Sequence, residues 1–305
     1  MLSKSRYLYG LQCPRLLWIV TNEPERIPEP DTVTQYRFDQ GKLVGKLAKR
    51  LFSHGVELPT DNFMQNILMT KELLRKRKPV FEAGVISGRL CARTDILSPV
   101  GDNDNEWDII EVKSSTSAKE IDYHDVAFQR FCWEQAGVRI RKCFIACINS
   151  QYVRYGEVDP KGLFSMCDVS EKVLKASKGI RDRVASMLET MSSPNCPEAD
   201  IGQHCNDPYD CPIRDCWEDV PEHNVFTLYS SGRKSRDLYE LGMIDIRDIP
   251  SSYHSQLNEK QRIQCRCVAD GKPYADTSGI REFLGTLEYP LYYLDFETFA
   301  TPVPI

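Results

Sequence analysis

The sequence predicts an α/β domain, with a mixed sheet flanked by helices, followed by a smaller helical extension. Three observations support this fold class. Apolar residues recur at helical spacing before residue 77, short β-rich segments follow between 80 and 113, and a long helical segment then leads into another apolar strand. The chain has 305 residues, of which 41% are hydrophobic and 27% charged, and this composition excludes disordered and collagen-like classes.

Each element is predicted from its own periodicity. Residues 3–20, 35–52 and 62–76 carry helical patterns, and the last ends in the basic run 75–78 before Pro79. The strand pattern then gives a meander, because a Ser87-Gly88 turn separates two of its strands. The expected strands are 80–86, 89–97, 107–113, 142–149 and 152–158, and the later helices are 119–137 and 169–191.

Charge and cysteine content narrow the possible partners and compartment. The net charge is −5, so a nucleic acid would have to be held by a local groove. The apolar run Leu16–Val20 is far shorter than the roughly 20 residues that span a bilayer, which predicts a cytoplasmic protein with no membrane partner. Twelve cysteines in a reducing compartment favour metal ligands over disulfides.

Two acids and a lysine form the first candidate site. Side chains alternate along a strand, so Glu111 and Lys113 point the same way, and Asp95 on the preceding strand converges on Glu111 if the strands pair. Two carboxylates and the Val112 carbonyl offer the all-oxygen set that Mg²⁺ or Mn²⁺ takes. Lys113 would orient or deprotonate a water, which predicts phosphodiester hydrolysis. The plain alternative is a solvent-facing strand edge.

The segment from Gly84 to Lys113, followed by Gln129 to Trp133, resembles the PD-(D/E)XK nuclease core of the RecB-like exonucleases. The resemblance implies a restriction-endonuclease-like fold, cleavage of DNA, and a role for Gln129 near the catalytic centre. These nucleases often place a metal-binding His on the second helix, but this chain has Gly41 and Gly45 there and no His. Glu82 is a further candidate metal ligand with a structural role as its alternative, and His124 and Asp125 are candidate substitutes for the missing His.

Three clustered cysteines form the second candidate site. Cys205, Cys211 and Cys216 lie in a proline-containing loop, and a tetrahedral site needs a fourth ligand. RecB-like nucleases with an iron–sulfur cluster, of the AddB and CRISPR-associated types, take one cysteine before the nuclease core and three after it. This resemblance implies that Cys13 completes a 4Fe-4S site. Alternatives are zinc on the same ligands, zinc with His204 or Cys196 exchanged in, and cysteines without metal.

The remaining sequence gives the domain organisation. Residues 1–222 are expected to form the nuclease domain, and residues 223–289 a helical connector with a helix-hairpin-helix-like unit at 231–249. Residues 290–305 begin an apolar strand with Asp295 and Glu297 on one face. This D-x-E arrangement resembles the start of DEDD-type exonuclease domains, which implies the N-terminal part of a longer bacterial protein, with both acids inert in this chain.

The favoured function is therefore metal-dependent DNA cleavage, exonucleolytic on single-stranded ends, in DNA repair or defence. One alternative is a DNA-binding module with a degenerate nuclease site. The other is a zinc-stabilised interaction scaffold.

Overall fold

The computed structural model describes residues 1–101, 105–298 and 300–304. Residues 102–104, which lie between two predicted strands, are outside this range, as are Phe299 and Ile305 of the C-terminal segment. The chain divides into two units, described separately below. Unit 1 comprises residues 1–199, 208–213 and 300–305, and unit 2 comprises residues 200–207 and 214–299.

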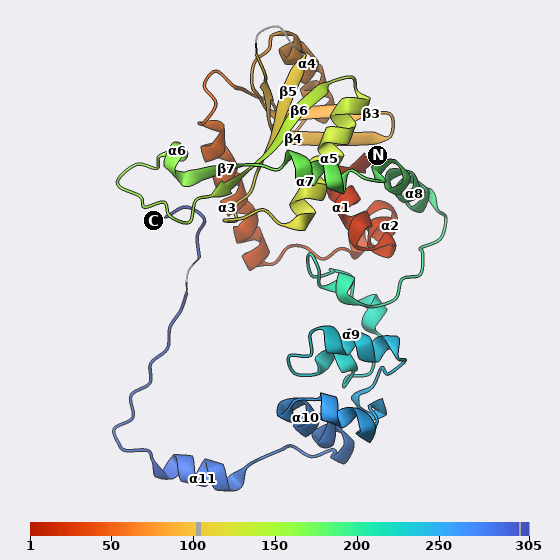
Figure 1. The fold of residues 1–305 in the computed structure, drawn as a ribbon, viewed down its shortest axis with the longest axis vertical. Helices are drawn as coiled ribbons and strands as arrows, with labels where there is room; N and C mark the ends of the chain where they lie inside the picture. The colour runs from red at the N-terminus through yellow and green to blue at the C-terminus, as the bar shows by residue number, and fades with distance from the viewer. Residues whose placement is uncertain (102–104, 299, 305) are drawn as a thin grey trace. The chain divides into compact units, whose positions relative to one another are not determined.

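Unit 1 is built on a seven-stranded mixed sheet, which confirms the α/β class. Its strands are β1 (Leu2–Ser3), β2 (Val56–Glu57), β3 (Val80–Ser87), β4 (Leu90–Pro99), β5 (Glu106–Val112), β6 (Arg139–Ile148) and β7 (Phe164–Asp168). The order is β2-β3-β4-β5-β6-β7, with β1 added in parallel beside β4. Strands β3, β4 and β5 form the predicted antiparallel meander. Strand β6 lies parallel to β5, so β5 has β4 on one side and β6 on the other (Figure 1).

Helices cover both faces of this sheet. They are α1 (Lys4–Gln12), α2 (Pro14–Asn22), α3 (Thr32–Lys49), α4 (Phe63–Arg75), α5 (Glu120–Gln135), α6 (Pro160–Leu163), α7 (Ser170–Ala176), α8 (Ile180–Ser192) and the 3-10 turn η1 (Pro24–Arg26). Ile96 and Ile110 pack with Val44 and Leu47 of α3, whereas the alternate residues of the same strands face the core that contains α5. The side chain of Glu111, two positions after Ile109, therefore faces α5.

Two predicted helices are each broken in the structure. The helix expected over residues 3–20 is α1 and α2, separated at Cys13 because Pro14 cannot continue the hydrogen bonding of α1 and instead begins α2. The helix expected over 169–191 is α7 and α8, separated by Gly179, whose φ of 68° is left-handed.

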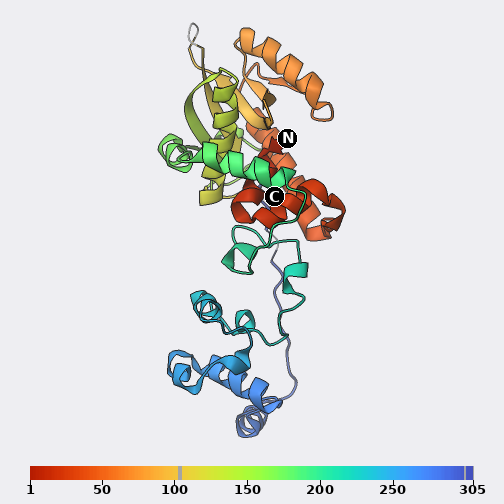
Figure 2. The ribbon, with the colours of Figure 1, turned by 90° about the vertical axis from the view of Figure 1, so that its right-hand side faces the viewer.

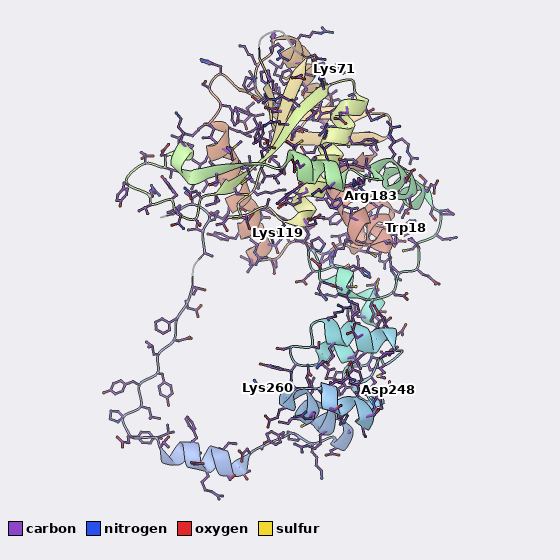
Figure 3. All side chains as sticks on the ribbon, in the orientation of Figure 1. Trp18, Lys71, Lys119, Arg183, Asp248 and Lys260 are labelled. Atoms are coloured by element: carbon purple, nitrogen blue, oxygen red, sulfur yellow. The ribbon has the colours of Figure 1, made fainter. Side chains whose placement is uncertain are left out.

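Unit 1 is stabilised by contacts between its first two helices and its last helix. Helices α1 and α2, red in Figure 2, pack against each other, and both also contact α8. The indole Nε1 of Trp18 donates to the Ser193 carbonyl at 2.9 Å, and Arg183 donates to the hydroxyl of Tyr7 at 3.3 Å; Trp18 and Arg183 are labelled in Figure 3. The N-terminal helices are thereby fixed to the last helix of the unit.

Unit 2 has its own small core. It contains η2 (Gln203–Cys205), η3 (Asp215–Trp217), η4 (Val225–Thr227), α9 (Arg233–Glu240), η5 (Ile246–Asp248), η6 (Ser251–Gln256), α10 (Glu259–Asp270) and α11 (Thr277–Gly285). Val225, Leu238, Ile246 and Cys265 are among its buried residues. In the helix-hairpin-helix-like unit expected at 231–249, α9 is the first helix, but the second is only the short 3-10 turn η5.

Two predicted strands are absent from the described residues. Residues 152–158 form no strand, and β7 instead pairs with β6 at 164–168. Residues 291–298 also form no strand, although their apolar pattern is strand-like, and Tyr292, Tyr293 and Phe296 are largely exposed. A strand needs a neighbouring backbone to bond, and an apolar pattern alone does not supply one. Among the helices that the structure describes, none is both long and apolar enough to cross a membrane.

Candidate active site

The two predicted carboxylates lie on neighbouring strands. Strands β4 and β5 pair Ile96 with Ile110 and Leu97 with Ile109, so the same register places Asp95 opposite Glu111. The Asp95 Oδ2 accepts a hydrogen bond from the Val112 backbone N–H at 2.8 Å. The expected convergence is therefore observed. Strand β4 ends at Pro99, two residues beyond the predicted end of this strand at residue 97.

Glu111 is buried and bonded on both oxygens. Its Oε1 accepts from the ammonium groups of Lys113 at 3.0 Å and Lys4 at 2.9 Å. Its Oε2 accepts from the side-chain amide of Gln129 on α5 at 2.7 Å. The structure thus brings together Asp95, Glu111, Lys113 and Gln129, which the sequence analysis had named, and adds Lys4 from α1.

Asp125 is the third carboxylate of this cluster. It is 2% exposed and lies one helical turn before Gln129, whose amide donates to its Oδ1 at 2.9 Å. Lys113 approaches its Oδ2 at 2.8 Å, and Lys4 approaches its Oδ1 at 3.5 Å. The i, i+4 spacing of Asp125 and Gln129 is a signal readable in the sequence, since such residues share a helix face. No comparable signal identifies Lys4.

Burial and neighbouring charges both shift the pKa values of this cluster. Burial opposes ionisation of Glu111, but the charges of Lys113 and Lys4 and the Gln129 hydrogen bond together lower its pKa below the ordinary value. Burial likewise opposes the charge on Lys113, yet Glu111, Asp125 and Asp122 raise its pKa well above the ordinary value. Burial and the nearby Glu111 raise the pKa of Asp95 to about 7. At neutral pH, Glu111 is therefore ionised and Lys113 is an ammonium.

Glu82 lies across the sheet from Asp95 in an unusual backbone conformation. The bridged pairs of β3 and β4 pass from Phe81 with Ile96 to Ala83 with Thr94, and Glu82 between them has a left-handed φ of 57°. Its carboxylate contacts Lys49 of α3 at 2.8 Å and Arg93 at 3.3 Å. Two cations already engage this candidate ligand.

Asn66 of α4 holds this strained segment. It is fully buried, and its amide nitrogen donates to the carbonyls of Glu82 and Pro59, both at 2.9 Å. A Cβ on Gly84 would lie 2.4 Å from the Asn66 Oδ1, so the close approach of α4 to β3 requires glycine at that position.

Asn66→Ala is expected to destabilise the protein by about 2–4 kcal/mol, because two partly buried carbonyls lose their donor. Urea denaturation followed by circular dichroism measures the change. Asn62→Ala, which removes the side-chain cap of α4 from the same helix, is the matched control and should cost only about 1 kcal/mol. Equal losses in the two variants would contradict a special role for Asn66.

The donors of the cluster fit a hard divalent cation. They are carboxylate oxygens of Asp95 and Glu111 and the Val112 carbonyl, which match the preference of Mg²⁺ and Mn²⁺. Gln129 is fully buried, and its Oε1 has no hydrogen-bond partner, which leaves an acceptor beside these carboxylates. Within residues 1–101, 105–298 and 300–304, no group of three or more His, Cys, Asp or Glu side chains has ligand geometry as it stands.

His124, a candidate substitute ligand, has different neighbours. Burial is the main cause that lowers its pKa, and the charged groups that act on it are Arg183 and Glu120. Of the two substitutes considered, Asp125 is the one that contacts Gln129 and Lys113.

The four predicted cluster cysteines are divided between the units. Cys13 and Cys211 belong to unit 1 and are both buried, whereas Cys205 and Cys216 belong to unit 2 and are half-buried. Within unit 1, the Gln12 side chain donates to the Tyr209 carbonyl at 2.7 Å, so the chain around Cys211 contacts the residue before Cys13. Of the possible exchange ligands, Cys196 lies in unit 1 and His204 in unit 2.

A scan against protein-family models and a search of curated proteins each found no match to this chain.

Proposed function

We propose that unit 1 is a metal-dependent DNA nuclease of the RecB-like PD-(D/E)XK type. The observation that carries this proposal is the convergence of Asp95, Glu111, Lys113 and Gln129 from two paired strands and the following helix. A solvent-facing strand edge does not account for it, because Glu111 is only 2% exposed and is bonded on both oxygens.

Asp95, Glu111 and the Val112 carbonyl would hold Mg²⁺ or Mn²⁺, which when bound supplies a Lewis acid for the phosphate and lowers the pKa of water. Because Lys113 is an ammonium at neutral pH, its role is to orient water and offset phosphate charge, and not to remove a proton. Gln129 and Asp125 fix the rotamers of Glu111 and Lys113. Glu82, opposite Asp95 on the neighbouring strand, is already paired with Lys49 and Arg93, so it is not assigned as a metal ligand.

A 4Fe-4S cluster on Cys13, Cys205, Cys211 and Cys216 is the second part of the proposal. Its support is the residue pattern and, within unit 1, the contact of Gln12 with Tyr209. Burial of Cys13 and Cys211 also fits cluster ligands, since such clusters are shielded from water.

The test of the nuclease proposal uses the anaerobically purified protein with end-labelled single-stranded and double-stranded DNA. Cleavage in Mn²⁺ or Mg²⁺ that EDTA stops is expected, with single-stranded ends preferred. DNA binding without cleavage would favour the module with a degenerate site, and neither binding nor cleavage would reject both.

Asp95→Asn is expected to stabilise the metal-free protein at alkaline pH. A carboxyl whose folded pKa is raised from 3.8 to about 7 contributes stability below pH 4, and that contribution is lost as the pH rises towards 7. Asparagine removes the buried charge and still accepts the Val112 N–H. In EDTA, urea denaturation should show a gain of about 1–3 kcal/mol at pH 8 and little change at pH 4. The same difference at both pH values would contradict this account.

A further inference from the structure

Lys4 contributes a positive charge to the cluster from the N-terminal helix α1, outside the segments 84–113 and 129–133 in which the sequence predicted the site. It is the first residue of α1, directly after β1, and its ammonium lies 2.9 Å from the Glu111 Oε1 and 3.5 Å from the Asp125 Oδ1. The parallel pairing of Leu2 with Leu90 and Ser3 with Cys91 brings the start of α1 beside the strand that carries Asp95. Lys4 is therefore held at the site by the sheet.

Lys4 and Lys113 share one oxygen of Glu111 but are held to different degrees. Lys113 also contacts Asp125 at 2.8 Å and Asp122 at 3.5 Å, so three carboxylates surround it. Lys4 makes one short contact with a carboxylate, and its other is at 3.5 Å. Two ammonium groups already occupy the Glu111 Oε1, so a cation that binds this oxygen must replace one of them, and Lys4 has fewer other contacts to the site than Lys113.

The charge of the cluster supports the same conclusion. Asp95, Glu111, Asp122 and Asp125 supply four carboxyl groups, and the ammonium groups of Lys4 and Lys113 each lie within 3.5 Å of at least two of them. The cluster as a whole is therefore not positive, but the Lys4 ammonium lies 2.9 Å from the Glu111 Oε1, and a divalent cation at that oxygen would be repelled unless the ammonium withdrew.

We propose that Lys4 is an exchangeable counter-ion of the catalytic site, which occupies Glu111 in the metal-free protein and is displaced when a divalent cation binds. This inference rests on the proposed function. It assigns Lys4 to the control of metal affinity: the metal concentration needed for loading depends on how firmly Lys4 holds Glu111. A Lys4 that remained on Glu111 would also weaken metal binding by repulsion, so displacement is distinguished by whether the Lys4 ammonium becomes more accessible when the metal binds.

The test compares Mn²⁺ binding, without DNA, by the wild type, Lys4→Met and Lys142→Met. Lys142 forms a contact of 2.8 Å with Asp168 between β6 and β7, so its variant is a matched loss of one lysine ion pair. Isothermal titration should show about tenfold tighter Mn²⁺ binding in Lys4→Met and no change in Lys142→Met. Equal or weaker binding in a folded Lys4→Met protein would overturn the inference.

A second measurement uses the unaltered protein, in case Lys4→Met does not fold. Acetic anhydride labelling read by mass spectrometry should show Lys4 becoming at least threefold more reactive when Mn²⁺ is added, with Lys142 unchanged. Unchanged Lys4 reactivity at saturating Mn²⁺ would overturn the inference alone, since metal-dependent cleavage would still support the proposed function. Absence of both Mn²⁺ binding and cleavage in the wild type would reject the function and the inference together.

Discussion

Glu111→Gln is expected to reduce DNA cleavage by about a thousandfold or more, because it removes the carboxylate charge that a divalent cation and Lys113 both require. Glutamine keeps the size of the side chain. Alanine is a poorer choice than glutamine. Glu111 is buried, and removing its side chain would leave the ammonium groups of Lys4 and Lys113 without their shared acceptor.

The matched control for this prediction is Asp108→Asn on the same strand. Asp108 is also a buried acid with charged partners, because its carboxylate accepts two hydrogen bonds from Arg141, at 2.6 and 3.0 Å. It should lose some stability and keep its cleavage rate. Initial rates on labelled single-stranded DNA at saturating Mn²⁺ measure both variants, and a Glu111→Gln rate close to that of Asp108→Asn would refute the site.

Cys13→Ser is expected to give a pale, protease-sensitive protein with less than a quarter of the wild-type iron. A cluster that links Cys13 to cysteines about 200 residues later would increase the free energy of unfolding by on the order of 5 kcal/mol, in the chain-entropy model used for disulfides. Whole domains are stable by only about 5–15 kcal/mol, so its loss should be felt throughout the fold. Iron analysis and the visible absorption of anaerobic protein measure the effect.

The control for the cysteine prediction is Cys265→Ser. Cys265 is buried in the small core of unit 2, and its variant should keep full iron and colour. A local zinc loop of Cys196, Cys205, Cys211 and Cys216 would instead leave Cys13→Ser with full metal content, and that result would overturn the long-range assignment.

The meander, the helix after it and the convergence of the two acids were predictable because each depends on local pattern. Alternation along β4 and β5 determines the face of Asp95 and Glu111, and pairing in a hairpin determines their register. The spacing of Asp125 and Gln129 on α5 is also local. These elements carry most of the candidate site.

The features that the sequence did not reveal depend on contacts between distant segments. Lys4 reaches Glu111 only because β1 pairs with β4, and a two-residue strand has no detectable period. Glu82 adopts a left-handed φ although a glutamate in a strand pattern gives no indication of it. The side chain of Asn66, from α4, donates to the Glu82 carbonyl and holds this conformation. At residues 291–298 the sequence instead predicted a strand that the structure does not form, because the strand pattern has no partner strand to pair with.

The most direct test of the central claim is the location of Mn²⁺ in crystals of the protein grown with that ion. The account predicts one strong anomalous peak between the carboxylates of Asp95 and Glu111, at about 2.0–2.3 Å from their oxygens, with the Lys4 ammonium no longer bonded to Glu111. Crystals at saturating Mn²⁺ with no peak at these carboxylates, and with Lys4 still bonded to Glu111, would contradict it.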